Sequence, residues 1–212
     1  MLPYSREVYF SLFEQLNGSR PIAVWLSLAL ALVLSAMAFR SGSAARRSQC
    51  ALLASLWIGC MAFWFLATTG GLNFMAPAFA GLQALGLGLA AILPGPRDAG
   101  TRPSLPAAAL FGVALLWPLL DGWNGPGWPL LRIGALYPEP LILLSLGVLA
   151  DLRPRGWSLP LALPLLLLAG VSAYEAQALG LVQNYLPLAG FAAFALAQWA
   201  ASARDRSGPI LG

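Results

Sequence analysis

The sequence contains no Lys and no His, so its twelve basic residues are all Arg. Without Lys, the chain cannot form a Schiff base with a cofactor such as retinal. Without His, it lacks the commonest transition-metal ligand and the commonest acid–base group. The sequence also shows no nucleophile paired with a base, no metal-ligand cluster and no phosphate-binding loop. We therefore expect no enzyme activity, no cofactor and no metal site.

Charged residues are scarce as well. They make up 9% of the 212 residues, hydrophobic residues make up 59%, and the mean hydropathy is +0.74. A soluble domain carries about 25% charged residues. The polar residues are too few to coat a water-facing surface, so lipid is the expected solvent. We predict a single integral membrane domain over residues 1–212, built as an all-α polytopic bundle.

Cysteine is nearly absent. Cys50 and Cys60 lie ten residues apart in one apolar segment. In a helix this spacing separates them by about 15 Å, which is too far for a disulfide. We expect both to be small buried residues.

Residues 1–20 form a distinct segment with an amphipathic pattern. Ser5 is a plausible N-cap, and Asn17-Gly18 ends the pattern. The segment predicts a short helix lying in the membrane interface. Its apolar residues recur at helical spacing and are Val8, Tyr9, Leu12, Phe13 and Leu16.

Seven apolar stretches follow, and most approach the roughly 20 residues that cross a hydrocarbon core. They predict a bundle over residues 21–203 and a tail over residues 204–212. The predicted spans are Ile22–Phe39, Cys50–Thr69, Phe74–Leu93, Leu105–Leu120, Leu136–Ala150, Trp157–Tyr174 and Leu181–Ala200.

The Arg residues predict the orientation of the spans. Nine of the twelve fall in alternate connections, and the four Glu residues fall on the other side. The positive-inside rule then places the N-terminus outside and the C-terminus in the cytoplasm. This distribution also explains the net charge of +4 without a nucleic-acid partner. Abundant Ala, Leu and Gly with Arg but no Lys is typical of a GC-rich bacterium, which predicts the bacterial cytoplasmic membrane. The nine residues are Arg40, Arg46, Arg47, Arg97, Arg102, Arg153, Arg155, Arg204 and Arg206.

Four stretches carry small residues at every fourth position, which places each row on one helix face. Such rows let helices approach closely in lipid, so we expect them to form the internal seams of the bundle. Gly59, Ala80, Ala84, Gly88, Ala193 and Ala197 are the expected packing residues. The rows are Ala23/Ser27/Ala31/Ser35, Ala51/Ser55/Gly59, Ala76/Ala80/Ala84/Gly88 and Ala189/Ala193/Ala197/Ala201.

The connection over residues 121–140 is the strongest candidate for a ligand or partner site. It holds four Gly and four Pro residues, so it predicts ordered turns rather than helix, and short spans flank it. Short spans often mark binding sites in transporters. The charged and aromatic residues of this connection would form a cup open to the outside. They are Asp121, Trp123, Trp128, Arg132, Tyr137 and Glu139.

The preferred interpretation of these residues is simpler. Trp and Tyr concentrate at membrane interfaces in any case, and Asp121, Glu139 and Glu175 would then mark the water boundary. No charge lies deep within a predicted span, so the usual intramembrane sign of function is missing. Gln83 is the deepest polar residue. For it, and for Gln183 and Asn184, we expect helix-to-helix hydrogen bonds.

Several short motifs spread along the chain form a recognisable pattern. They are Met1-Leu2-Pro3, Ser5, Glu7, Phe13, Asn17, Trp57-x-Gly59, Trp64, Pro138-x-Pro140 and Gly147. In these motifs the chain resembles a family of small bacterial membrane proteins known only as a domain of unknown function. The resemblance covers nearly the whole chain and implies its architecture but no activity. The family has His at the position of Phe63 and Cys at the position of Glu139, so a metal or redox role would not carry over.

Three functions remain open. The first is a non-catalytic subunit of a larger membrane complex, favoured by the small-residue faces and the lack of intramembrane charge. The second is a small-solute transporter or channel using the outer cup around Asp121, Arg132 and Glu139. The third is a membrane enzyme working with Asp121, Glu139 or Glu175, which is disfavoured because His and Lys are absent. Of these we prefer the subunit.

Overall fold

The computed structural model describes residues 5–40, 42–68, 75–93, 97–98, 103–124, 127–153 and 155–206. Over these residues the chain is helical apart from its connections and one pair of two-residue strands, which confirms the all-α class. The elements are α1 (Arg6–Ser19), α2 (Pro21–Met37), α3 (Ser43–Gly59), the π-helical η1 (Cys60–Thr68), α4 (Met75–Ile92), β1 (Arg97–Asp98), α5 (Leu105–Leu115), α6 (Trp117–Asn124), α7 (Pro138–Ala150), β2 (Leu152–Arg153), α8 (Arg155–Leu179), the 3-10 turn η2 (Val182–Tyr185) and α9 (Leu186–Arg206).

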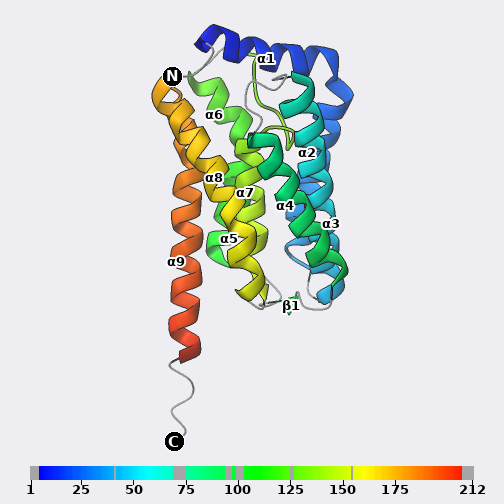
Figure 1. Cartoon of the computed structure of the whole chain (residues 1–212), viewed down its shortest axis with the longest axis vertical. Coiled ribbons are helices and arrows are strands. Elements are labelled where there is room, and N and C mark those ends of the chain that lie inside the picture. Colours follow the sequence, from blue (N-terminus) through cyan, green and yellow to red (C-terminus); the bar gives the residue numbers. More distant parts are fainter. Residues whose placement is uncertain are drawn as a thin grey trace, which may run out of the picture.

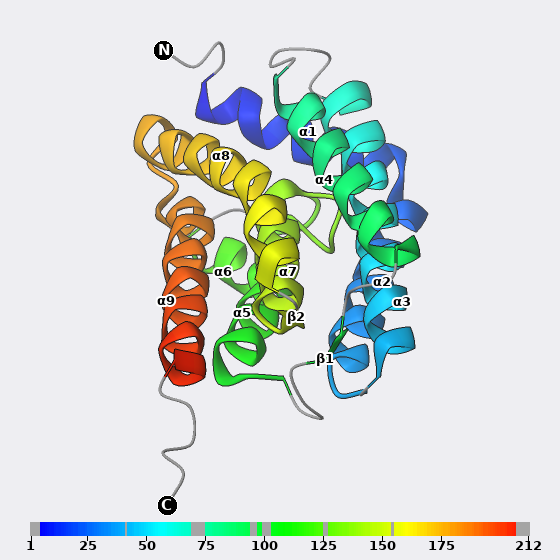
Figure 2. The same ribbon diagram turned by 60° about the horizontal axis from the view of Figure 1, so that its bottom comes forward.

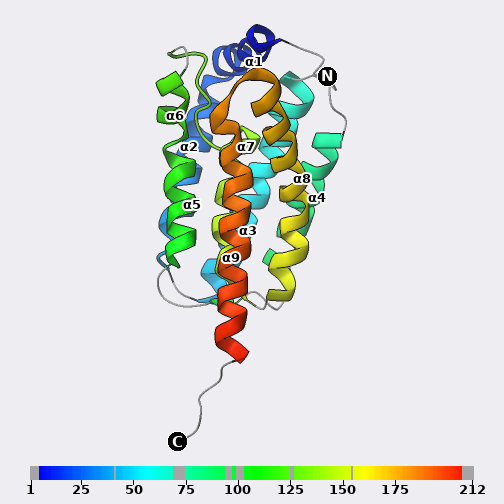
Figure 3. The same ribbon diagram turned by 90° about the vertical axis from the view of Figure 1, so that its left-hand side faces the viewer.

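The helices form a bundle with one helix laid across its end. α1 crosses the end of the bundle, and the chain turns by 93° into α2, which runs along the bundle (Figure 1). The strands lie at the opposite end. α9 packs beside α5 and α8, and its last turns project beyond that end (Figure 3). We refer below to the α1 end and the strand end.

α7 is the centre of the bundle. All of its residues, Pro138–Ala150, are buried, and it packs against α3, α5, α8 and α9 (Figure 2). Its 13 residues extend only about 20 Å, less than the hydrocarbon thickness of about 30 Å. The non-helical segment before it, residues 132–137, is also buried. Irregular backbone at membrane depth is tolerated where protein covers it, and this segment meets that condition.

Each predicted span corresponds to a helix, but the helices differ in length and straightness. Among the described residues, three helical stretches are long and apolar enough to cross a membrane, and up to five are if each bent pair is one span. The predicted fourth span bends by 53° between α5 and α6, just before Pro118, which supplies no backbone N–H. α9 continues to Arg206, past residue 204, where the predicted tail begins. Among the predicted boundaries, Thr69 and Phe74 lie outside the described residues, as do residues 1–4 and 207–212.

The predicted amphipathic helix is α1, and the Ser5 cap is confirmed. The Ser5 hydroxyl accepts a hydrogen bond from the Val8 amide at 3.4 Å. Two details were wrong: Val8 is 45% exposed, and Asn17 continues the helix with its side chain buried. The face that α1 turns toward the bundle is therefore partly polar.

Two of the four small-residue rows lie inside the bundle. On α4, Ala76, Ala80 and Ala84 are buried against neighbouring helices. On α2, Ser27 and Ala31 are buried in the middle of their row. The row on α4 therefore lies at a helix seam, whereas the buried part of the row on α2 faces the loop that precedes α7.

The other two rows face outward, contrary to expectation. On α3, Ala51 and Ser55 are exposed, although a Cβ at Gly59 would lie 3.1 Å from Leu136. On α9, Ala189 and Ala193 are exposed and Ala197 is half-buried. α9 instead packs through Gly190, Phe194 and Gln198, which are buried. At Gly190 the approach to α7 is so close that a Cβ would lie 2.5 Å from the Leu143 side chain. Spacing alone did not identify the buried face.

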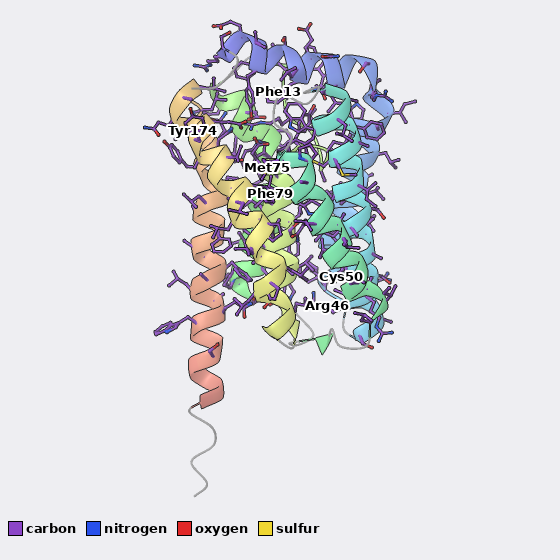
Figure 4. All side chains as sticks on the ribbon, viewed as in Figure 1. Phe13, Arg46, Cys50, Met75, Phe79 and Tyr174 are labelled. Atoms are coloured by element: carbon purple, nitrogen blue, oxygen red, sulfur yellow. The ribbon has the colours of Figure 1, made fainter. Side chains whose placement is uncertain are left out.

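The connections predicted to share one side meet at the strand end. Arg97 pairs with Arg153 between β1 and β2, which joins the α4–α5 and α7–α8 connections. Arg46 was expected in a connection but lies in the first turn of α3, buried and donating to Gln49 at 2.8 Å. Figure 4 shows Arg46 and Cys50 far from Phe13 at the α1 end. Cys50 and Cys60 are free and buried, as predicted. Arg102 lies outside the described residues.

Trp57 joins α3 to the central helix. Its indole N–H donates to the Ser145 hydroxyl on α7 at 2.9 Å, and both residues are fully buried. We expect Ser145→Ala to lower the free energy of unfolding by about 0.6–1.7 kcal/mol, the range for hydrogen bonds between membrane helices. Unfolding in mixed micelles, followed by Trp fluorescence, measures the loss. The matched control is Ser55→Ala, because Ser55 is exposed and bonds only within α3; an equal loss in both variants would contradict the prediction.

Gly134 lets the buried loop lie directly on α2. It has φ +79°, and a Cβ there would meet the Ser27 hydroxyl, the Leu28 amide nitrogen at 2.7 Å and the Val24 carbonyl oxygen at 2.9 Å. The next residue, Ala135, donates its amide to Ser27 at 3.1 Å. The small row on α2 thus accommodates a loop rather than a helix.

Candidate functional site

A buried ion pair at the α1 end fixes the loop that precedes α7. Arg132 lies in that loop and Asp121 on α6. The guanidinium donates to the two carboxylate oxygens from Nη2 at 2.6 Å and from Nε at 2.9 Å. The Arg132 amide also donates to Asp121, at 2.9 Å. This bidentate geometry is the strongest that an Arg–carboxylate pair adopts.

The same guanidinium reaches two further elements. Its Nη1 lies 3.1 Å from Oε1 of Glu139, in the first turn of α7, and donates to the amide oxygen of Asn184 on η2 at 2.8 Å. Gln183 donates to Asp121 at 3.4 Å. Arg132 therefore connects α6, α7 and η2.

Aromatic rings enclose the guanidinium. Its central carbon lies 5.4 Å from the ring centre of Phe13 and 5.0 Å from that of Trp117. Arg132 and Glu139 are 1% exposed and Asp121 is 5% exposed. The carboxylates of Asp121 and Glu139 thus compensate the buried cation.

Tyr9 attaches α1 to the cluster. Its hydroxyl lies 3.1 Å from Oε1 of Glu139 and 3.1 Å from Oε2 of Glu175 on α8, and it accepts from the Asn184 amide at 3.4 Å. Burial, followed by the charges of Glu139 and Glu175, raises the pKa of Tyr9. The phenol therefore keeps its proton.

A second contact ties α1 to the loop. The Asn17 amide donates to the carbonyl oxygens of Pro129 and Leu131, the latter at 2.8 Å, and its oxygen accepts from Tyr137 at 2.7 Å. Asn17 thus satisfies backbone groups that the loop cannot pair by itself.

The structure brings together part of the predicted cup. Asp121, Arg132 and Glu139 converge, and Tyr137 lies beside Phe13 with ring centres 5.5 Å apart. Trp123 is 87% exposed, and Trp128 stacks on Trp25 at 5.8 Å, away from the charges. The aromatic walls are instead Phe13 and Trp117. α1 covers the site, so it does not open outward as expected.

Several members of the cluster were not anticipated. Tyr9 was assigned to an apolar face, Asn17 to a helix end, and Trp117 to a span. Asn17 is a polar residue on the otherwise apolar face of α1, and it was the signal in the sequence that could have indicated this contact. Gln183 and Asn184 do form hydrogen bonds between elements, but they bond to the ion pair rather than to a neighbouring span.

Some buried polar atoms have no hydrogen-bond partner in the described part of the chain. Both amide atoms of Gln83 are among them, as are Oε2 of Glu139 and the indole nitrogen of Trp117. The helix-to-helix hydrogen bond expected for Gln83 is therefore not formed among these residues. Trp117 and Glu139 both contact Arg132 and so belong to the cluster.

The cluster is suited to holding elements together. It contains three carboxylates, one guanidinium and two phenols, with Arg132 at its centre. Among the described residues, no group of three or more His, Cys, Asp or Glu could hold a metal ion.

Fold and site together define an all-α protein with three to five candidate membrane spans and an ionic cluster capped by α1. Comparison with protein-family models, with curated proteins and with solved structures finds no match.

Proposed function

We propose that the protein is a multi-span subunit of a bacterial membrane complex and has no catalytic role of its own. The observation that carries this proposal is the closed state of the site. Arg132, Asp121, Tyr9 and Asn17 bind α1, α6 and the loop to one another, and α1 covers them. Side chains that bond to one another in this way stabilise a fold rather than bind an external solute.

Seven crossings complete the proposed topology. Each of the seven apolar stretches contains a helix among its described residues, and the buried loop extends the short α7. The pairing of Arg97 with Arg153 supports a common side for the Arg-rich connections, while Glu139 and Glu175 lie at the α1 end. With positive residues inside, α1 lies outside and the C-terminus is cytoplasmic.

The outward small-residue face of α9 supports a partner in the membrane. Ala189, Ala193 and Ala197 follow one another at a spacing of four; the first two are exposed and Ala197 is half-buried. Small rows of this kind let a second membrane helix approach closely. The partner we propose is therefore a transmembrane helix of another subunit.

Gentle extraction of the tagged protein, with mass spectrometry of stoichiometric companions, tests this function. Ala193→Leu is expected to lower recovery of the partner by about tenfold, because about 1.4 kcal/mol of overpacking corresponds to that factor. Ala195→Leu is the matched control, since Ala195 is also exposed but lies about 200° around α9. A protein that runs alone, or a partner lost equally in both variants, would overturn the proposal.

Small-solute transport is the second candidate, and the unpaired Gln83 amide favours it. A polar group buried in α4 is a potential contact along a path from the α1 end. Transport in proteoliposomes that is abolished by Gln83→Leu would support this function in place of the first.

A further inference from the structure

The outward face of α1 offers little apolar surface to lipid. Its apolar face lies on the bundle, where Tyr9, Phe13 and Leu16 are at most 2% exposed. A helix that lies in the membrane interface buries its apolar face in the lipid instead. Apart from Val8, the exposed residues of α1 are polar or Gly, and they are Arg6, Glu7, Ser11, Glu14, Gln15, Gly18 and Ser19.

The next helix, α2, indicates where the lipid begins. An exposed Arg stands at each end of it, Arg20 before its first turn and Arg40 beyond its last. The 17 residues of α2 extend about 25 Å, close to the hydrocarbon thickness of about 30 Å. Its exposed large side chains are apolar and include Leu26, Leu32 and Val33. Because α1 lies across the bundle end beyond Arg20, it lies at or above the edge of the hydrocarbon layer (Figure 1).

Exposed Trp and Tyr side chains gather at the same end of the bundle, on four different elements. Trp25 is in the second turn of α2, and Trp128 of the loop stacks on it with ring centres 5.8 Å apart. Tyr174 and Tyr185 are exposed beside the residues of α8 and η2 that contact α1. Figure 4 shows Tyr174 at this end. Trp123 is exposed on α6, the helix that supplies the carboxylate of the ion pair. We call these five side chains the aromatic belt.

We infer that the aromatic belt is the surface that binds the lipid headgroup layer at the α1 end, and that α1 lies beyond it in water. Trp and Tyr suit this layer because each has an apolar ring and a polar N–H or O–H group. α1 is then a water-facing cover of the ionic cluster, which differs from the interfacial position that the sequence predicts. This position requires a bundle that spans the membrane, but it does not depend on a partner subunit.

Nitroxide labels on the full chain in phospholipid vesicles test the position of α1. A label at Glu14→Cys is expected to collide mainly with a water-soluble nickel complex, and a label at Leu196→Cys mainly with oxygen, which concentrates in lipid. Glu14 is exposed on α1, and Leu196 is exposed in the middle of α9. The nickel-to-oxygen collision ratio should therefore be several-fold higher at position 14. Cys50 and Cys60 are buried, so the unaltered protein is the control for background labelling.

The possible outcomes separate the cover from the bundle that carries it. A label at position 14 that reads as lipid, like the one at position 196, would overturn the inference. Labels that both read as water would show that the bundle does not span the membrane, and would overturn the inference together with its premise. Neither result concerns the partner subunit, which the extraction experiment measures separately.

Fluorescence quenching tests the aromatic belt. The emission that is lost in Trp123→Phe should be quenched more by lipids with a nitroxide at the headgroup than by lipids with a nitroxide deep in the acyl chain. The added emission of Leu196→Trp should show the opposite order, because position 196 is midway along α9. Stronger quenching of Trp123 by the deep nitroxide, or quenching by neither lipid, would show that the belt does not bind the headgroup layer.

Discussion

Replacing Arg132 with Ala is expected to lower the free energy of unfolding by about 3–5 kcal/mol, the cost of removing one partner of a buried ion pair. The substitution leaves the carboxylates of Asp121 and Glu139 without their cation, and both are almost fully buried. It also empties the space between Phe13 and Trp117. Unfolding in mixed micelles with increasing SDS, followed by Trp fluorescence, measures the loss.

Two comparisons separate the ion pair from a general effect of losing Arg. Arg6→Ala removes an exposed Arg that lies 5.6 Å over Phe10, and it should cost no more than about 1 kcal/mol. The double variant Asp121→Ala with Arg132→Ala should cost less than the sum of the single variants, because the Asp121 carboxylate is then absent and only Glu139 is left without its cation. Equal losses for Arg132→Ala and Arg6→Ala would show that the cluster does not stabilise the fold.

Gly134→Ala adds a single methyl group and is expected to lower the free energy of unfolding by about 2–5 kcal/mol, the sum of left-handed backbone strain and overpacking. Gly134 has φ +79°, and the new Cβ would meet backbone atoms of Val24 and Leu28, which cannot move without shifting α2. The loop would have to lift from α2, which would also break the hydrogen bond from Ala135 to Ser27.

The same unfolding assay measures this loss, with Gly170→Ala as the matched control. Gly170 lies within α8, where a Cβ would meet nothing within 4 Å. That substitution should be neutral or stabilising by up to about 1 kcal/mol, since Ala favours helix over Gly. If Gly134→Ala is as well tolerated as Gly170→Ala, the loop does not lie against α2 as described.

Local pattern predicted the helices because each is a continuous apolar stretch. It did not identify which face of a helix is buried where the composition is uniform. In an Ala-rich helix such as α9, a row of small residues at every fourth position arises on several faces. The seam that forms is the one at which Gly190 fits Leu143. Such a fit depends on the shape of another helix, which no local pattern contains.

The candidate site was predictable only where its residues are close in sequence. Asp121, Arg132 and Glu139 fall in one connection, so their convergence was a reasonable hypothesis. Tyr9 contacts Glu139 and Glu175 across 130 and 166 residues. A contact over that separation depends on the path of the whole chain, which explains why α1 was not recognised as the cover of the site.

The cluster at the α1 end also bears on synthesis. Tyr9 is made early, yet its partners extend to Asn184, so the cluster cannot close until most of the chain has emerged. Until then Arg132, Asp121 and Glu139 are charges in an incomplete bundle that lacks η2. The cluster therefore closes only after most of the chain has been made. A chain stopped before Asn184 would leave these charges incompletely covered, and membrane quality control could recognise it by them.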